Sequence, residues 1–388
     1  MPTTANILLD LLVVFAAAKL FGEVFERLKL PAVVGEIIAG IIIGPYGLGL
    51  VRTISVPLVT LSLLGVIVLR FVVGLETKPS EFFRVGPRAI VVAALGVILS
   101  FAGGIGFGLI FGFSWLAALF IGTAIVSTSV GVTARVLKDR GIVRHEVSKL
   151  ILAAAVIDDV IGLLLLAIVM GSVNGSFQPI RIIVVAGGIV LFLVFELWIA
   201  PKLVQRHAHL LEYLHIPNAP FVVAMIIMLA TAAISEQIGL AAVIGGFLAG
   251  MMLAETDDRY CLERDTRPLY DWLVPYFFAM TGMGVRLALF RDPRILGLGV
   301  LLTVIAIGAK VVGCGLGDLG RGLREMLAVG VGMIPRAEVP LVVAAAGVTL
   351  KIIDARLYAV LIFVVVASLL ISPPMLSLVL PKAGHGAA

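Results

Sequence analysis

Residues 150–171 read LILAAAVIDDVIGLLLLAIVMG, an apolar run that carries two adjacent aspartates, Asp158 and Asp159. About 20 consecutive apolar residues span a bilayer as an α-helix, so this run predicts a transmembrane helix. An ionised carboxylate inside it costs roughly 3 kcal/mol or more, and intramembrane acids usually mark an ion or proton path. Adjacent helical residues point about 100° apart, so the two acids need not share a partner.

The composition of the whole chain indicates an integral membrane protein. Apolar residues make up 61% of the 388 residues and charged residues only 14%, which is more apolar surface than a soluble domain can bury. The chain starts without a basic segment before its apolar run, so we interpret the start as a first helix rather than a cleavable signal. The net charge is +5, and the basic residues lie mostly at the ends of predicted helices. This distribution favours a lipid bilayer over a nucleic acid as partner.

We predict an all-α polytopic membrane protein with thirteen transmembrane helices. The spans lie near residues 5–27, 31–48, 56–76, 88–112, 115–137, 147–171, 180–203, 218–237, 238–255, 269–290, 294–317, 322–348 and 357–381. Lys and Arg predominate in the loops that are cytoplasmic if the N-terminus is outside. This excess predicts a cytoplasmic C-terminus and a multi-pass protein of the cell inner (plasma) membrane.

The fourth to sixth spans and the eleventh to thirteenth form two similar triplets, and the middle helix of each is interrupted. The interrupting residues are Ser127, Thr128, Ser129, Gly131 and Thr133 in the first triplet, and Gly332 and Pro335 in the second. The two middle helices lie seven spans apart and therefore cross the membrane in opposite directions. Paired interrupted helices in inverted repeats are typical of a transporter's substrate site. The hydroxyls of Thr128 and Ser129 are candidate cation ligands, although Ser and Thr commonly bond back to their own helix.

Lys310 lies in the middle of the apolar run LLTVIAIGAKVVGCGLG, residues 301–317. A lysine at this depth needs a partner or must be neutral. We predict an ion pair between Lys310 and Asp158, which leaves Asp159 to bind a proton or a cation. The alternative is a salt bridge that only braces the core. Because hard cations prefer oxygen ligands, a sodium ion and a proton would exclude each other at Asp159.

Other charged residues are weaker candidates. Arg336 and Glu338 follow the second break and are predicted to support the site, either structurally or by tuning its pH response. Arg70 is predicted to extend to the cytoplasmic interface, with a gating role as the alternative. Glu36 is interpreted as a polar contact between helices. The histidines His207, His209 and His215 are interpreted as part of a membrane-surface loop rather than a metal site or pH sensor.

Four segments carry a family resemblance: GTAIVSTSVGVTARVL, AAAVIDDVIGL, IGAKVVG and VGVGMIPRAEVPLVVAA. They resemble bacterial sodium/proton antiporters of the monovalent cation:proton antiporter-2 family, most closely the NapA type. The resemblance covers nearly the whole chain in order. It departs from the pattern at Ala337 and Pro340, where the family usually has glycine, and at Arg70, where it has an apolar residue.

The resemblance implies an NhaA-like antiporter fold with inverted repeats and two discontinuous crossing helices. It implies a homodimer in which a moving core carries the ion past a fixed scaffold, with Asp159 as the transport carboxylate. Residues 1–84 and 211–292 would form the dimerisation domain, 85–175 and 293–388 the core, and 176–210 the linker helix. The pattern of two aspartates with a lysine is that of electrogenic members.

We therefore predict a secondary-active electrogenic antiporter that exchanges Na⁺ or Li⁺ for H⁺ by elevator-like alternating access and needs no cofactor. A K⁺/H⁺ antiporter of the same family is one alternative, and a gated cation channel is a second. The sequence lacks a GxxxxGK[ST] loop and an HExxH pattern, which argues against ATP-driven transport and against an enzyme of the zinc-protease type.

Overall fold

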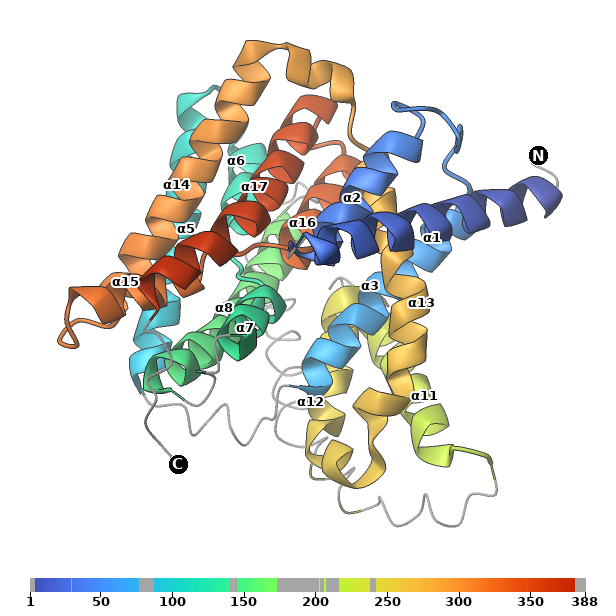
Figure 1. The fold of residues 1–388 in the computed structure, drawn as a ribbon, viewed down its shortest axis with the longest axis horizontal. Helices are drawn as coiled ribbons and strands as arrows, with labels where there is room; N and C mark the ends of the chain where they lie inside the picture. Colours follow the sequence, from blue (N-terminus) through green and yellow to red (C-terminus); the bar gives the residue numbers. More distant parts are fainter. Residues whose placement is uncertain are drawn as a thin grey trace. The chain divides into compact units, whose positions relative to one another are not determined.

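The computed structural model describes residues 4–28, 30–76, 87–139, 142, 145–172, 202, 206, 216–237 and 242–380. Fourteen α-helices and one short 3-10 helix occur among these residues (Figure 1). Twelve of the thirteen predicted spans contain a described helix. The seventh predicted span, the linker that contains it and the loop with His207, His209 and His215 fall almost entirely outside the described residues.

The described helices divide between two compact units. The first unit is formed by Met1–Ala16, Thr53–Arg84 and Met170–Met280, and the second by Ala17–Arg52, Val85–Val169 and Thr281–Ala388. Helices α1 (Thr4–Arg27), α8 (Glu146–Ser172) and α13 (Leu262–Met283) contribute residues to both units.

The first unit is built on the close packing of α3 (Val56–Leu75) against α12 (Ala242–Tyr260), with α11 (Ala219–Gln237) beside α12. Gly74 and Gly250 face the opposite backbone so closely that a side chain at either would collide with it. Phe71, Met228 and Leu253 fill the apolar core between the three helices. Close backbone contact through glycine is a common way for helices to associate in lipid.

The second unit contains the two interrupted triplets. The first triplet consists of α5 (Pro87–Ile110), the short helices α6 (Trp115–Ala124) and α7 (Val130–Asp139), and α8 (Glu146–Ser172). The second consists of α14 (Pro293–Gly317), the short helices α15 (Leu323–Gly332) and α16 (Glu338–Thr349), and α17 (Ala355–Val379). The short helix α2 (Ala32–Ile43) and the 3-10 helix η3 (Leu287–Arg291) also belong to this unit.

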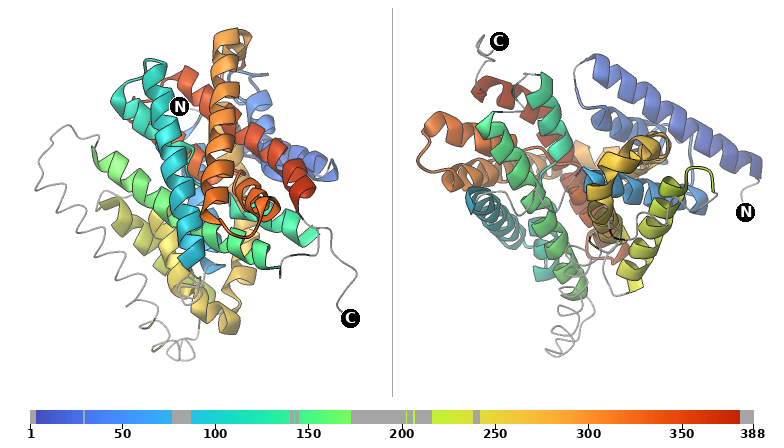
Figure 2. Two further views of the ribbon diagram at one scale, coloured as in Figure 1. Left: turned by 90° about the vertical axis from the view of Figure 1, so that its left-hand side faces the viewer. Right: turned by 90° about the horizontal axis from the view of Figure 1, so that it is seen from below.

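Helix α5 lies along α14, so the first helices of the two triplets are neighbours (Figures 1 and 2). Gly313 and Gly317 of α14 face the α5 backbone at Leu95 and Val92 with no room for a side chain. Side-chain caps fix where several helices start. Asp292 accepts a hydrogen bond from Arg294 N at the start of α14, and Asp354 accepts one from Leu357 N at the start of α17.

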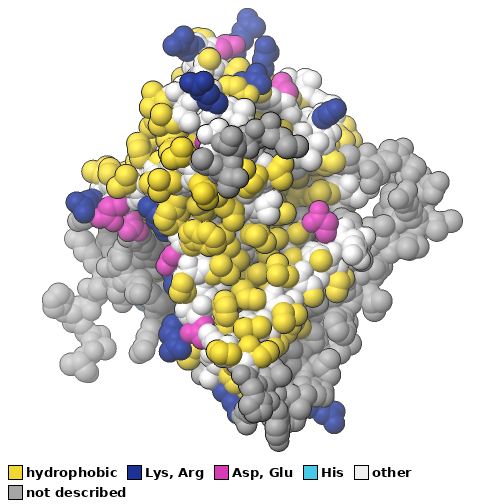
Figure 3. All heavy atoms as spheres, turned by 90° about the vertical axis from the view of Figure 1, so that its right-hand side faces the viewer, with side chains coloured by type: hydrophobic (Ala, Val, Ile, Leu, Met, Phe, Trp, Pro, Cys, Tyr) yellow, Lys and Arg dark blue, Asp and Glu magenta, His cyan; other side chains and the backbone are white. Residues whose placement is uncertain are grey.

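Six of the described helices are long and apolar enough to cross a membrane, namely α3, α5, α8, α11, α14 and α17. Large apolar side chains such as Leu12, Leu20 and Val24 of α1 are more than half exposed. Figure 3 shows a face on which hydrophobic side chains predominate and lysine and arginine side chains lie mostly toward the margins. An apolar exterior of this kind suits lipid rather than water.

Candidate functional site

The interruptions in the two middle helices lie against each other. Helix α6 ends at Ala124 and α7 starts at Val130, while α15 ends at Gly332 and α16 starts at Glu338. Three hydrogen bonds join the two breaks: Thr128 Oγ1 donates to Met333 O at 3.0 Å, Thr133 Oγ1 to Gly332 O at 2.7 Å, and Ser129 N to Pro335 O at 2.6 Å. Each break thus satisfies backbone groups that the other exposes by leaving the helix.

Helix α8 lies along both breaks. Its Ile151 fills the space beside Gly332, and its Gly162 lies so close to Ser127 that an added Cβ would be 3.1 Å from that of the serine. Asp158 follows Ile151 by seven residues and precedes Gly162 by four, so the three residues share one stripe of the helix. The helical repeat therefore directs Asp158 toward the crossed breaks and turns Asp159 by about 100° from it.

Lys310 of α14 meets Asp158 at this point. Lys310 Nζ lies 2.5 Å from Asp158 Oδ1, and both side chains are fully buried. Gly96 of α5 lies beside the lysine, and a Cβ there would be in ordinary contact with Lys310 Nζ at 3.6 Å but would collide with Cys314 Sγ. Asp159 is also buried, with 3% of its surface exposed. Two adjacent acids in one helix therefore have different surroundings, and Asp158 is the one bound to the lysine.

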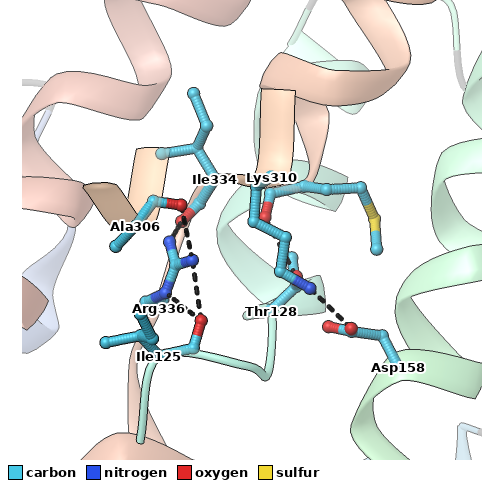
Figure 4. A network of polar contacts seen from close by, with 8 residues as sticks. Ile125, Thr128, Asp158, Ala306, Lys310, Ile334 and Arg336 are labelled. Atoms are coloured by element: carbon cyan, nitrogen blue, oxygen red, sulfur yellow. Dashed lines mark hydrogen bonds and ion pairs between the residues drawn. The ribbon is translucent and has the colours of Figure 1, made fainter. Parts of the chain in front are cut away.

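Arg336 forms a second polar centre between the breaks. Its Nε and Nη2 donate to Ile125 O at 2.9 and 2.8 Å, its Nη2 also donates to Ala306 O at 2.9 Å, and its Nη1 donates to Ile334 O at 2.8 Å. Its backbone nitrogen donates to Ser368 Oγ of α17 at 3.3 Å. Figure 4 shows the guanidinium contacts beside the Lys310–Asp158 pair. The centre connects the end of α6, the middle of α14 and the second break.

The comparison with known proteins identifies this architecture. The family described as "Sodium/hydrogen exchanger, transmembrane" matches residues 11–382. The chain belongs to this family. It is a multi-pass membrane transporter rather than an enzyme.

Curated relatives of this exchanger match over nearly their whole length. The chain is 33% identical to the high-affinity Na⁺/H⁺ antiporter NhaS3 of Synechocystis, over 96% of this chain and 89% of the relative. It is 35% identical to the probable Na⁺/H⁺ antiporter GerT of Bacillus cereus, with 95% and 97% covered. It is 32% identical to the Na⁺/H⁺-K⁺ antiporter GerN of the same organism, with 94% and 93% covered.

Among solved structures, this exchanger resembles the sodium proton antiporter MjNhaP1 from Methanocaldococcus jannaschii at pH 8. The TM-score is 0.70 at 19% identity, and the match covers 97% of this chain and 98% of that one. At this identity the likeness concerns the fold. The prediction of an all-helical membrane protein with an antiporter fold is therefore confirmed at that level.

The structure brings most of the predicted site residues together in the second unit. The assembled residues are Ser127, Thr128, Ser129, Gly131, Thr133, Asp158, Asp159, Lys310, Gly332, Pro335 and Arg336. Glu338 starts α16, but its side chain lies outside the described part. Glu36 is buried in α2 near Gly22 of α1, as expected for a contact between helices. The snorkelling predicted for Arg70 is wrong, because the residue is fully buried in α3.

Sequence reasoning missed two features of this exchanger. It treated Arg336 only as support, although an arginine directly after the proline of a helix break signals carbonyls that need donors. It also missed Asp318 at the C-terminal end of α14, which lies 3.6 Å from Arg88 Nε of α5 and 4.0 Å from Arg321 Nε. Burial raises the pKa of Asp318, and Arg321 and Arg88 oppose that change. No pattern along the chain indicates that α5 and α14 meet there.

Proposed function

We propose that this exchanger is a secondary-active, electrogenic antiporter in which H⁺ and Na⁺ or Li⁺ compete for Asp159. The observation that carries the proposal is the buried Lys310–Asp158 pair beside the crossed breaks. The pair gives Asp158 a fixed partner, and we assign the exchange to its buried neighbour Asp159, as the resemblance to the antiporter family implies. The relatives named as Na⁺/H⁺ antiporters support the choice of ions.

The chemistry at Asp159 follows from ligand preference. A sodium ion prefers oxygen ligands, and a protonated carboxyl group cannot serve as an anionic one. Thr128 donates its hydroxyl hydrogen to Met333 O, so the lone pairs of its oxygen face away from that bond and can accept or coordinate. With Thr128, Ser129 is the second hydroxyl we assign to the cation. Binding of the cation then requires loss of the proton, which is the condition for antiport.

The electrogenic part of the proposal concerns Lys310. Two aspartates with a lysine are the pattern of the electrogenic members of the family that the sequence resembles. Exchange of one cation for more than one proton moves net charge across the membrane. The test is current on a solid-supported membrane: Lys310→Gln is expected to carry less charge per transported cation. An unchanged charge per cycle would remove this part of the proposal.

The site itself is tested in proteoliposomes with an imposed pH gradient, to which Na⁺, Li⁺ or K⁺ is added in turn. The unmodified exchanger is expected to release protons on addition of Na⁺ or Li⁺, and Asp159→Asn is expected to respond no more than protein-free liposomes. Glu146→Gln is the matched control, because Glu146 is a mostly exposed acid in the same helix. Full activity of Asp159→Asn would contradict the proposed site.

A K⁺/H⁺ antiporter is the second candidate, because one relative is named as a Na⁺/H⁺-K⁺ antiporter. A response to K⁺ alone would replace Na⁺ by K⁺ in the proposal. A gated channel is the candidate from another class. It would pass single-channel current without obligatory proton exchange.

Finer features remain part of the proposal. We assign the chain to the NapA type of the monovalent cation:proton antiporter-2 family, with thirteen spans, the N-terminus outside and elevator-like motion of the core. Residues 85–175 and 293–388 would form that core, 1–84 and 211–292 the scaffold of a homodimer, and 176–210 the linker. The two triplets of α5–α8 and α14–α17, each with an interrupted middle helix, support the core assignment.

A further inference from the structure

Arg336 has a role that neither the Lys310–Asp158 pair nor exchange at Asp159 explains. The residue is fully buried, and its side chain donates four hydrogen bonds to three main-chain oxygens, those of Ile125, Ala306 and Ile334. We call these three oxygens the carbonyl cluster. Among the described residues, no carboxylate lies within ion-pair distance of the guanidinium.

The carbonyl cluster exists because helices end there. Ile125 is the C-cap of α6, and Ile334 lies in the second break, so neither oxygen has a helical N–H partner in the next turn. The C-terminal end of a helix also carries partial negative charge. Ala306 lies inside α14, and its carbonyl oxygen has a second lone pair beyond the helical hydrogen bond. Three partly negative oxygens from separate segments thus converge in a buried space.

Converging main-chain oxygens are the groups that replace the hydration shell of a monovalent cation in a membrane protein. Arg336 fills this cluster with a group that is only a donor and stays protonated. We propose that Arg336 is a tethered cation that permanently occupies a carbonyl-lined cation site, and that this site takes guanidinium once the side chain is removed. The site consists of main-chain oxygens and does not include Asp159, so it is additional to the ion-exchange site of the proposed function.

Two consequences follow for the exchanger. First, the transported cation is kept out of the carbonyl cluster and left to the carboxylate at Asp159. Second, the bond to Ala306 holds α14 one turn before Lys310, so Arg336 positions the lysine against Asp158. Arg336 also adds a fixed positive charge close enough to Asp158 to interact with it electrostatically.

Chemical rescue of the purified full-length protein tests the site without measuring transport. Arg336→Ala is expected to unfold at a lower temperature than the unmodified protein, and millimolar guanidinium is expected to raise its unfolding temperature. The unmodified protein should show no such rise, because its site is filled. Urea is the matched solute, since it has a similar shape and donors but no charge. If guanidinium fails to stabilise Arg336→Ala, or if urea stabilises it equally, the proposal is wrong.

Two further substitutions decide the question if Arg336→Ala does not fold. Arg336→Lys keeps the positive charge but reaches fewer oxygens, whereas Arg336→Gln keeps polarity and loses the charge. The tethered cation requires Arg336→Lys to unfold at a higher temperature than Arg336→Gln. Equal unfolding temperatures for the two variants would overturn it.

Measurement of transport distinguishes an electrostatic role of Arg336 from a purely structural one. Of these experiments, only this one rests on the proposed function. Loss of a fixed positive charge makes proton binding at the nearby acids easier. Half-maximal exchange in Arg336→Gln should therefore move to higher pH, while Arg336→Lys keeps the original pH profile. A lower rate of exchange in Arg336→Gln with an unchanged pH profile would show that the role of Arg336 is only structural and would contradict an electrostatic role. Absence of Na⁺ exchange in the unmodified protein would instead reject the proposed function and leave the guanidinium result standing.

Discussion

Helix α14 carries two charged side chains that are both fully buried, Lys310 in its middle and Asp318 at its C-terminal end. Lys310 Nζ lies 2.5 Å from Asp158 Oδ1. Asp318 has two arginines at 3.6 and 4.0 Å, and these arginine side chains are 43% and 28% exposed. Neither carboxylate oxygen of Asp318 has a hydrogen-bond partner among the described residues.

The difference between Lys310 and Asp318 shows that a charged side chain in the middle of the membrane needs a closer partner than one at the end of a helix. In the middle of a membrane helix no water can replace a lost partner, so the acid and the base must meet directly. At the end of the helix, two partly exposed arginines lie 3.6 and 4.0 Å from the carboxylate and only partly offset the cost of its burial. The Lys310–Asp158 pair is therefore the contact whose loss should cost most, and the Asp318 cluster should tolerate substitution.

Lys310→Ala should have the largest effect on stability. It leaves Asp158 as a buried charge without its base, which costs about 3–5 kcal/mol in the free energy of unfolding. Arg321→Ala, just beyond the C-terminal end of α14, is the matched control, and its expected cost is at most about 1 kcal/mol. Unfolding in detergent by a chemical denaturant measures both.

A double substitution sharpens this prediction. Lys310→Met combined with Asp158→Leu removes both charges and should recover most of the lost stability while abolishing exchange, because an apolar pair replaces the ion pair. If Lys310→Ala and Arg321→Ala cost the same free energy, depth does not distinguish the middle of α14 from its C-terminal end.

The same contrast explains what the sequence could predict. A lysine and two aspartates in apolar runs need partners, so a pair between Lys310 and one of the aspartates follows from their positions in the sequence, and the family resemblance selects Asp158. Gly332 and Pro335 likewise indicate the second break. Every residue has a main-chain carbonyl oxygen, so the amino-acid sequence does not show which of them accept hydrogen bonds from a side chain. Nothing along the chain therefore indicates that Arg336 donates to Ile125, which lies 211 residues away. Arg70 was mispredicted because sequence position shows its depth along α3 but not what packs around it.

A substitution at the α5–α14 contact should have the next largest effect. Gly96→Ala places a Cβ against Cys314 Sγ beside Lys310, and the resulting overpacking is expected to cost about 1–3 kcal/mol. Gly106→Ala is the matched control on α5, because an added Cβ there meets nothing within 4 Å. This control should be neutral or stabilising, since alanine favours a helix over glycine.

A second substitution tests whether the cost of Gly96→Ala comes from the contact with Cys314. Cys314→Gly in the Gly96→Ala background removes the colliding sulfur and should restore part of the lost free energy of unfolding. The measurement is again denaturant unfolding in detergent. Equal costs for Gly96→Ala and Gly106→Ala would mean that the close contact between Gly96 and Cys314 does not limit the packing of α5 against α14.

Asp318→Asn should have a smaller effect, which depends on pH. Burial raises the pKa of the folded-state Asp318 carboxyl above its ordinary value of 3.8, so the folded state favours the protonated acid. The unmodified protein therefore gains stability from this group as pH falls through the range just above 3.8, and that gain is lost as pH rises. Asp318→Asn should be at least as stable near neutral pH and should lack this acid-side gain.

Unfolding temperatures across a pH series measure the Asp318 effect. Glu146→Gln is the control, because Glu146 is the mostly exposed partner of Arg321 in the same cluster. Marked destabilisation of Asp318→Asn at neutral pH would show that pairing with Arg88 and Arg321 outweighs burial. In that case the charges in the middle of α14 and at its C-terminal end would behave alike.

The smallest effect on stability and exchange is expected from cysteine substitutions made for labelling. Labelling determines the side of the membrane at which α14 ends. Cys261 is exposed at the start of α13, and Cys314 is buried in α14. With the N-terminus outside, an impermeant maleimide should label Cys261 in inverted vesicles but not in intact cells, and Cys314 in neither. In a Cys261→Ser background, Leu319→Cys adds a thiol at a position that is 64% exposed, next to Asp318. It should be labelled from the same side as Cys261 with little change in exchange, because neither position contacts the ion pair. Labelling from opposite sides would contradict the predicted topology, and labelling of Leu319→Cys in intact cells would place the Asp318 end of α14 outside the cell.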